Sequence, residues 1–105
     1  MRVAEEVPVL LKLQCGLRRL NDPSKWVKGS FDRSGSYCIL TACDCTINKW
    51  DNRVHDRLLA SIRVLFPNHG HSHSSVTIFN DRCATYDDVI EVLHHAIRTE
   101  EQCQS

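Results

Sequence analysis

The segment Ser36–Trp50, SYCILTACDCTINKW, is the most cysteine-dense part of this chain of 105 residues and is predicted to form its central buried helix. Gly35 lets the chain turn sharply before it, and the Ser36 hydroxyl oxygen can accept a hydrogen bond from an amide in the first turn. Apolar side chains then recur at helical spacing and leave little of the circumference polar. They are Ile39, Leu40, Ala42, Cys43, Ile47 and Trp50. Because such a helix must be covered on most sides, we expect the other segments to pack around it.

A helix over residues 8–20 is predicted to precede the central one. Pro8 suits a first helical turn, and leucines recur at helical spacing after it. The sequence Asn-Asp-Pro at 21–23 ends this helix, and Asp22 can cap a short turn that holds Trp26. The inward-facing residues are expected to be Leu10, Leu13, Leu17 and Leu20.

Two more helices and one short extended segment are predicted after the central helix. Asp51 or Asn52 can cap a helix over about 52–66, which a proline ends. Thr85 and Asp88 form an approximate capping box for the last helix, which is expected to end near residue 98. Between these helices, the sequence SVTIF at 75–79 is rich in β-branched residues and predicts an extended segment.

Together these elements predict a mainly α, compact four-helix single domain with one short extended segment near 75–79. A chain of 105 residues has about the commonest domain size and can bury one core, but it has no room for a second. We expect one domain over 1–105, with an ordered core over about 8–98 and a C-terminal tail that frays.

The charges of the chain balance, with 13 Lys and Arg against 13 Asp and Glu, but they are unevenly placed. Residues 1–35 are rich in Lys and Arg, and residues 67–105 are rich in Asp and Glu. The last helix is therefore expected near the N-terminal segment, within one molecule or between two. A net charge of zero argues against generic nucleic-acid binding, which depends on clustered cations.

The N-terminal segment resembles a signal peptide only superficially. Lys12 and Gln14 interrupt its apolar stretch, and two glutamates stand where positive charge is expected. No run reaches the roughly 20 apolar residues that a membrane span needs. We therefore predict a cytoplasmic protein with no membrane partner, in which the six cysteines are reduced and mostly buried. In a secreted chain, six cysteines would make a plausible disulfide set.

Three groups of residues carry a resemblance to a known family. The first is W-x-x-G at 26–29, and the second is Tyr37–Ala42 (YCILTA), which is similar to the pattern C-x-x-G-A. The third is FND at 79–81, followed by T-x-x-D-V-x-x-x-L-x-x-A-I at 85–97. Over about Leu10 to Arg98 this order resembles a family of small bacterial proteins of unknown function, with Thr41 where the family has glycine. The resemblance implies one domain and brings no reaction, cofactor or partner.

Cys38 is a candidate nucleophile. It stands in the first turn of the predicted central helix, where the positive end of the helix dipole favours a thiolate. A cysteine nucleophile needs a base and an orienting partner, and His71 or His73 followed by Asn80 supplies those types. The chain order Cys, His, Asn is that of papain-like enzymes. The alternative is a buried helix cysteine, because sequence does not establish that these residues are adjacent in space.

Three histidines that alternate along a polar segment, His69, His71 and His73, are candidate metal ligands. In an extended conformation their imidazoles share one face, and three histidines with an open position are a catalytic zinc arrangement. A nearby Cys43 or Cys45 could complete a structural site. The spacing matches no standard zinc finger, so we prefer a solvated loop and no cofactor.

Trp50, Asn80 and Asp81 are candidate binding residues. Trp50 stands at the predicted end of the central helix between two charged residues, so it is the aromatic side chain most expected to be partly exposed. Asn and Asp favour turns and bond to nearby amides. A local structural role at the start of the last helix is therefore the preferred reading for Asn80 and Asp81.

Two functions are compatible with these residues. We prefer a non-enzymatic helical module that binds an unknown protein partner or forms a homo-oligomer, which includes an inhibitor or accessory protein of a phage or other mobile element. The uneven charge and a β-prone segment that could extend a partner's sheet are enough for it. The alternative is a small hydrolase or transferase with Cys38 as nucleophile, His71 or His73 as base and Asn80 as orienter, or a metal-binding protein that uses residues 69–73.

Overall fold

The computed structural model describes residues 8–28, 32–33, 36–46, 49–67 and 75–103. These residues form a mainly α fold, which confirms the predicted class. The long helices are α1 (Val9–Arg19), α3 (Asn52–Leu65) and α5 (Tyr86–Cys103). The short helical elements are η2 (Pro23–Lys25), α2 (Ile39–Ala42), α4 (Val76–Ile78) and the π-helical turn η4 (Phe79–Cys83). Two strands of two residues each, β1 (Asp32–Arg33) and β2 (Ser36–Tyr37), pair antiparallel.

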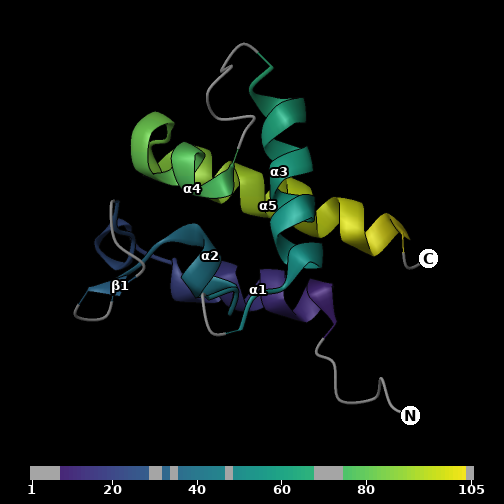
Figure 1. Ribbon diagram of the computed structural model, residues 1–105, viewed down its shortest axis with the longest axis horizontal. Helices are drawn as coiled ribbons and strands as arrows, with labels where there is room; N and C mark the ends of the chain where they lie inside the picture. The colour runs from purple at the N-terminus through teal and green to yellow at the C-terminus, as the bar shows by residue number, and fades with distance from the viewer. Residues whose placement is uncertain (1–7, 29–31, 34–35, 47–48, 68–74, 104–105) are drawn as a thin grey trace.

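The helix α5 is the element against which the other long helices pack (Figure 1). The N-terminal α1 makes its most extensive contacts with this acidic C-terminal helix, so the predicted proximity of the two charged ends occurs within one molecule. The helix α3 crosses α5, and an ion pair between Arg57 and Glu100, 2.9 Å long, joins them. No helix in the described parts of the chain combines the length and the apolar character needed to cross a membrane.

The helix α1 forms much as its leucine spacing predicts. Leu13 and Leu20 are fully buried, Leu17 is half-buried against the core, and Leu10 is half-buried. Pro8 is the N-cap residue, one position before the first helical turn. Gly16 faces the central segment, and a Cβ atom at this position would collide with the Cys43 sulfur. With cysteine at position 43, the close approach of the two chain segments therefore favours glycine here.

The prediction of one long helix over residues 36–50 is wrong in its extent. Ser36 belongs to β2, and the helical part is only the four residues of α2. Asp44 has a φ of 59°, which is a left-handed conformation that interrupts a right-handed helix. Arg19 stabilises this ending, because its guanidinium donates to the Ala42 carbonyl at 3.2 Å and to the Asp44 carboxylate at 2.9 Å.

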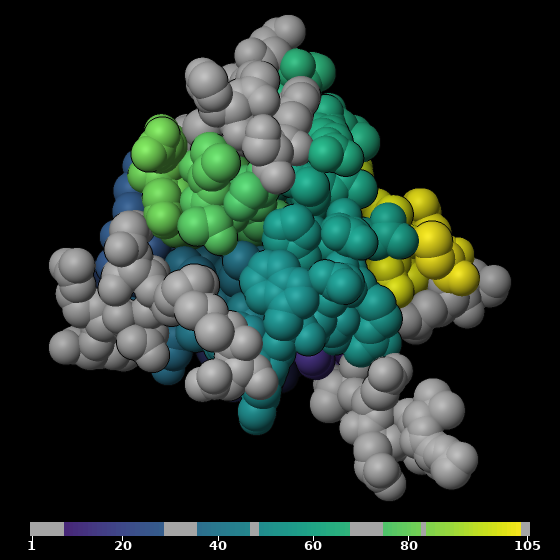
Figure 2. Space-filling view, in the orientation of Figure 1, coloured from purple at the N-terminus to yellow at the C-terminus, as the bar shows by residue number. Residues whose placement is uncertain are grey.

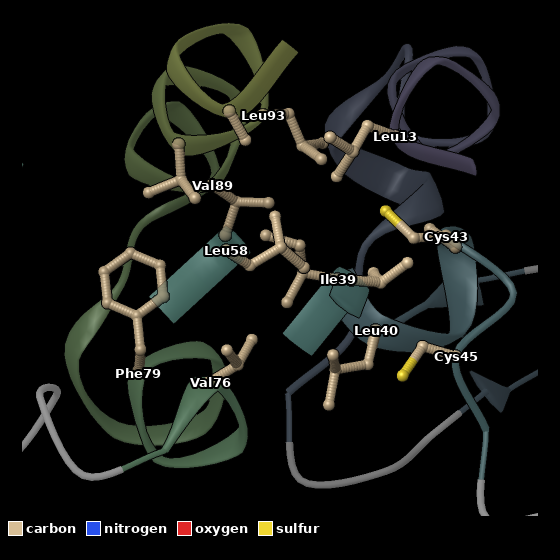
Figure 3. Packing of buried hydrophobic residues seen from close by; sticks show 14 of the residues in the cluster. Leu13, Ile39, Leu40, Cys43, Cys45, Leu58, Val76, Phe79, Val89 and Leu93 are labelled. Carbon is tan, nitrogen blue, oxygen red and sulfur yellow. The ribbon is translucent and has the colours of Figure 1, made fainter. Parts of the chain in front are cut away.

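Most of the apolar residues predicted for this segment are nevertheless buried, although Trp50 is 48% exposed and Ile47 lies outside the described residues. Ile39, Leu40, Ala42, Cys43 and Cys45 all have exposed fractions of 1% or less. Figure 3 shows the side chains of Ile39, Leu40, Cys43 and Cys45 among core side chains of α1, α3, α4 and α5. Burial at the centre of the fold is therefore achieved by a short helix and the turn after it.

The prediction of an extended segment over residues 75–79 is also wrong. These residues begin α4 and η4, because the Ser75 hydroxyl caps the helix by accepting from the amides of Thr77 at 3.0 Å and Ile78 at 3.4 Å. This local capping prevails over the extended preference of β-branched residues. Val76 and Phe79 then point into the core (Figure 3). On the face shown in Figure 2, this helical turn lies against α3.

The predicted caps of η2, α3 and α5 are confirmed, whereas α2 is capped by Cys38 and not by Ser36 as predicted. Asp22 accepts from the Ser24 amide at 2.9 Å, and Asp51 accepts from the amide two residues on at 3.0 Å. Thr85 and Asp88 form a reciprocal capping box at 3.1 and 3.2 Å, with aspartate in the place where glutamate is commoner. These caps fix where η2, α3 and α5 begin. The helix α5 continues to Cys103, so the prediction that it ends near residue 98 is wrong.

Candidate functional site

Asn80, which is 1% exposed, is a buried polar residue at the centre of the candidate site. Its Oδ1 accepts from the Trp26 indole nitrogen at 2.7 Å and from the Ile39 amide at 3.1 Å. Its Nδ2 donates to the Val27 carbonyl at 3.1 Å and to the Asp81 carboxylate at 2.8 Å. Both hydrogens and both lone pairs of the amide therefore have partners. One side chain thus joins the segment at 26–27, the start of α2 and the turn η4.

Trp26, which is bonded to Asn80, also has an aromatic and a cationic neighbour. The rings of Trp26 and Tyr86 lie 6.5 Å apart, and the Lys28 ammonium lies 5.6 Å from the centre of the Trp26 ring. The Tyr86 hydroxyl donates to the carbonyl of Leu20 at the end of α1. The short motifs at 26–29, 37–42, 79–81 and 85–97 therefore meet in space, and the described contacts among them are structural.

Cys38 is the N-cap residue of α2, and it is 6% exposed. Its sulfur accepts from the Thr41 amide at 3.5 Å and lies 3.5 Å from the Thr41 hydroxyl. Asn80 binds the amide of the next residue, so the two side chains flank the start of α2. His71 and His73 lie outside the described residues. The catalytic alternative with these residues as base stays a prediction.

The predicted metal ligands His69, His71 and His73 also lie outside the described residues. Among the residues that the structure does describe, no three His, Cys, Asp or Glu side chains are arranged to hold a metal ion. The cysteines considered as additional ligands, Cys43 and Cys45, are fully buried in the hydrophobic core.

Five cysteines in the described part of the chain are free thiols, and they are Cys15, Cys38, Cys43, Cys45 and Cys103. Burial raises the pKa of the Cys43 thiol, and burial is also the main cause that raises the pKa of the Cys45 thiol. Both groups are therefore neutral near pH 7 and pack as small apolar side chains. This supports the expectation that the buried cysteines contribute to the core.

Trp50 lies in the segment before α3, and not at a helix end as predicted. It is 48% exposed, which agrees with the expected partial exposure. Its indole nitrogen donates to the Asn52 side chain at 2.6 Å, and its ring lies 5.2 Å from the His55 ring. These two contacts orient the indole while about half of its surface stays exposed.

An ion-pair network lies beside Trp50. The Asp51 carboxylate accepts from Lys12 of α1 at 2.9 Å and from Arg53 at 2.7 and 3.0 Å. The Arg53 guanidinium, followed by Lys12, holds the pKa of the Asp51 carboxyl well below its usual value. The Asp51 side chain is only 10% exposed, so the network fixes the start of α3 against α1.

A cleft of about 550 Å³ opens between the start of α1, the first turns of α3 and the second half of α5. Sequence reasoning missed this cleft. Two of its residues, Arg53 and Arg57, stand one helical turn apart, which indicates a shared helix face. The pairing of Arg57 with Glu100, 43 residues further on, had no signal in the sequence. The residues that line the cleft are Pro8, Val9, Arg53, Asp56, Arg57 and Glu100.

A protein family matches most of the chain. The model of a family described as "Family of unknown function (DUF6197)" matches residues 4–99. No curated protein and no solved structure matches the chain. The matched range includes Asn80, Trp50 and every residue that lines the cleft except Glu100.

Proposed function

The chain belongs to DUF6197, a family of unknown function, and from that premise we propose that it is a non-enzymatic module that binds another protein or a second copy of itself. The observation that carries the proposal is the oriented, half-exposed indole of Trp50. Tryptophan is enriched among the residues that contribute most to protein–protein binding, because it buries a large surface at a small entropic cost.

The surroundings of Trp50 favour recognition. The bond to Asn52 and the ring contact with His55 restrict the indole before binding, which lowers the entropy lost when a partner covers it. Lys49 and Asn52 beside it are exposed and polar. An apolar centre with a polar rim is the usual organisation of an interface between proteins.

The described geometry gives less support to the enzymatic alternative. A cysteine nucleophile must reach its substrate, and Cys38 is 6% exposed with its sulfur bonded to the Thr41 amide. An orienting residue needs a free donor or acceptor for the base, and the amide of Asn80 is fully occupied by Trp26, Ile39 and neighbouring groups. For these reasons we place the function at the surface of the protein.

The proposal is tested with the variant Trp50→Ala and the matched control Val64→Ala. Val64 is an exposed hydrophobic residue at the other end of α3, 63% exposed, so the control removes apolar surface without touching Trp50. Sedimentation equilibrium measures self-association. For binding to another protein, partners that the wild type captures are first identified and produced separately. Each partner is then titrated by calorimetry against the wild type, Trp50→Ala and Val64→Ala.

The expected result is that Trp50→Ala weakens association by about 2 kcal/mol or more, roughly thirtyfold in Kd, whereas Val64→Ala leaves it unchanged. With 5-fluorotryptophan, the Trp50 resonance should shift on association and the resonance of Trp26, whose indole nitrogen is bonded to Asn80, should not. Equal affinities for the wild type and Trp50→Ala would refute the proposal.

A further inference from the structure

We propose that the cleft between α1, α3 and α5 is a second binding site, which takes a small zwitterionic ligand of the amino-acid or short-peptide class. Its volume of about 550 Å³ lies within the usual range for small-molecule sites, roughly 300–1,000 Å³. The inference rests on Arg57, Asp56 and the apolar start of α1, and it is independent of Trp50.

Arg57 is the anchor for a carboxylate. Its Nε donates to Glu100 at 2.9 Å, and its Nη2 lies 3.8 Å from the Cys103 sulfur. Within the described part of the chain, these are its side-chain partners. A guanidinium has five N–H donors, so an edge is left for a bidentate bond to a carboxylate. Glu100, whose side chain is 16% exposed, holds the guanidinium in place.

Asp56 is the anchor for an ammonium group. Its side chain is 76% exposed, and in the described residues its partner is the His55 ring at 3.3 Å. That contact is an ion pair only when the imidazole is protonated. The Asp56 carboxylate therefore keeps most of its capacity to accept hydrogen bonds from a ligand amine.

The charge of the lining selects the ligand class. Arg53 and Arg57 are balanced by Asp56 and Glu100, so the lining is neutral as a whole. A phosphate dianion would lie close to two carboxylates, whereas a zwitterion matches both signs. Pro8 and Val9 supply an apolar wall for a side chain. Because the wall is short, a small aliphatic amino acid such as leucine is a suitable probe.

The test is a titration of the whole protein followed by amide NMR. The probes are leucine, N-acetyl-leucine, which lacks the ammonium group, and leucine amide, which lacks the carboxylate. Leucine should shift the amide resonances of Val9, Arg57 and Glu100 in a saturable way. Each of the other two probes should bind about tenfold more weakly, because each loses one charged contact.

Two variants assign the contacts. Arg57→Gln should weaken leucine and N-acetyl-leucine about tenfold and leave leucine amide unchanged, whereas Asp56→Asn should weaken leucine and leucine amide and leave N-acetyl-leucine unchanged. Arg98→Gln and Asp87→Asn, at exposed positions of α5 that do not line the cleft, are matched controls and should bind as the wild type does.

Three results would overturn the proposal. They are the absence of saturable shifts with all probes, unchanged leucine affinity in Asp56→Asn, and tighter binding of inorganic phosphate than of leucine. Asp56 is exposed, so its variant is expected to fold and decides the outcome even if Arg57→Gln is destabilised.

Discussion

Replacing Asn80 with alanine is expected to destabilise the fold by about 3–5 kcal/mol, although the residue is a single polar side chain. The substitution leaves the buried Ile39 amide without its acceptor, which alone removes about 1–3 kcal/mol. The Trp26 indole nitrogen and the Val27 carbonyl lose partners at part-buried positions, and each adds a smaller loss because water can reach it. The sum is a large part of the roughly 5–15 kcal/mol of a typical domain.

Urea unfolding followed by far-UV circular dichroism measures this loss. Asn52→Ala is the matched control, because Asn52 also accepts from an indole but is exposed, and its loss should be within about 0.5 kcal/mol. Asn80→Asp keeps the side-chain shape and the acceptor but removes the donor to Val27, so it should also destabilise. If Asn80→Ala unfolds within 1 kcal/mol of the wild type, the hydrogen-bond cluster does not hold the three segments together and our reasoning is wrong.

Three further predictions follow from the described contacts. Gly16→Ala should destabilise the fold by about 1–3 kcal/mol in thermal or urea unfolding, because its methyl group collides with the Cys43 sulfur. The pKa of Asp51 is lower in the native state than in the unfolded state, so its ionised form stabilises the fold, and the free energy of unfolding should fall as the pH drops below about 4. The fall should be smaller in Asp51→Asn, whose side chain can still cap α3. Identical pH profiles for the two proteins would contradict this. In native protein at neutral pH, iodoacetamide should modify the exposed Cys103 much faster than the buried Cys38. Mass spectrometry of the peptides measures both rates. Rapid, selective reaction at Cys38 would instead support the enzymatic alternative.

The parts of the fold that were predictable from sequence are those fixed by neighbours in the chain. The capping box of Thr85 and Asp88 acts over three residues, and the cap at Asp51 acts over two. The apolar spacing of α3 likewise repeats within one element and places Leu58 in the core, where it is fully buried. Such patterns are complete in a short window of sequence.

Two wrong predictions of secondary structure have different causes. One depends on a residue far away in the chain, and the other depends on two local preferences that oppose each other. The end of α2 depends on Arg19, which is 25 residues from Asp44 in the chain. At residues 75–79 two local signals compete, and the Ser75 cap prevails over the β-branched residues. Sequence composition alone does not show which of the two is stronger.

The candidate site was not predictable in its partners. The preference of asparagine for turns predicted a local structural role for Asn80 at the start of the last helix, whereas most of its hydrogen bonds join segments that are far apart in the chain. Its contacts with Trp26, Val27 and Ile39 span 54, 53 and 41 residues, so only the folded chain reveals them. The cleft also depends on contacts between distant parts of the chain, because Glu100 and Arg57 come together only when α5 packs on α3.

The contact between Gly16 and Cys43 has a consequence for the family as a whole. The sulfur occupies the space that a side chain at position 16 would need, so the two positions share one fixed volume. Among relatives, a larger residue at the position of Gly16 should therefore be accompanied by a smaller one at that of Cys43, such as alanine or glycine. An aligned set of family members in which the two positions vary independently would show that α1 and the central segment do not keep this spacing across the family.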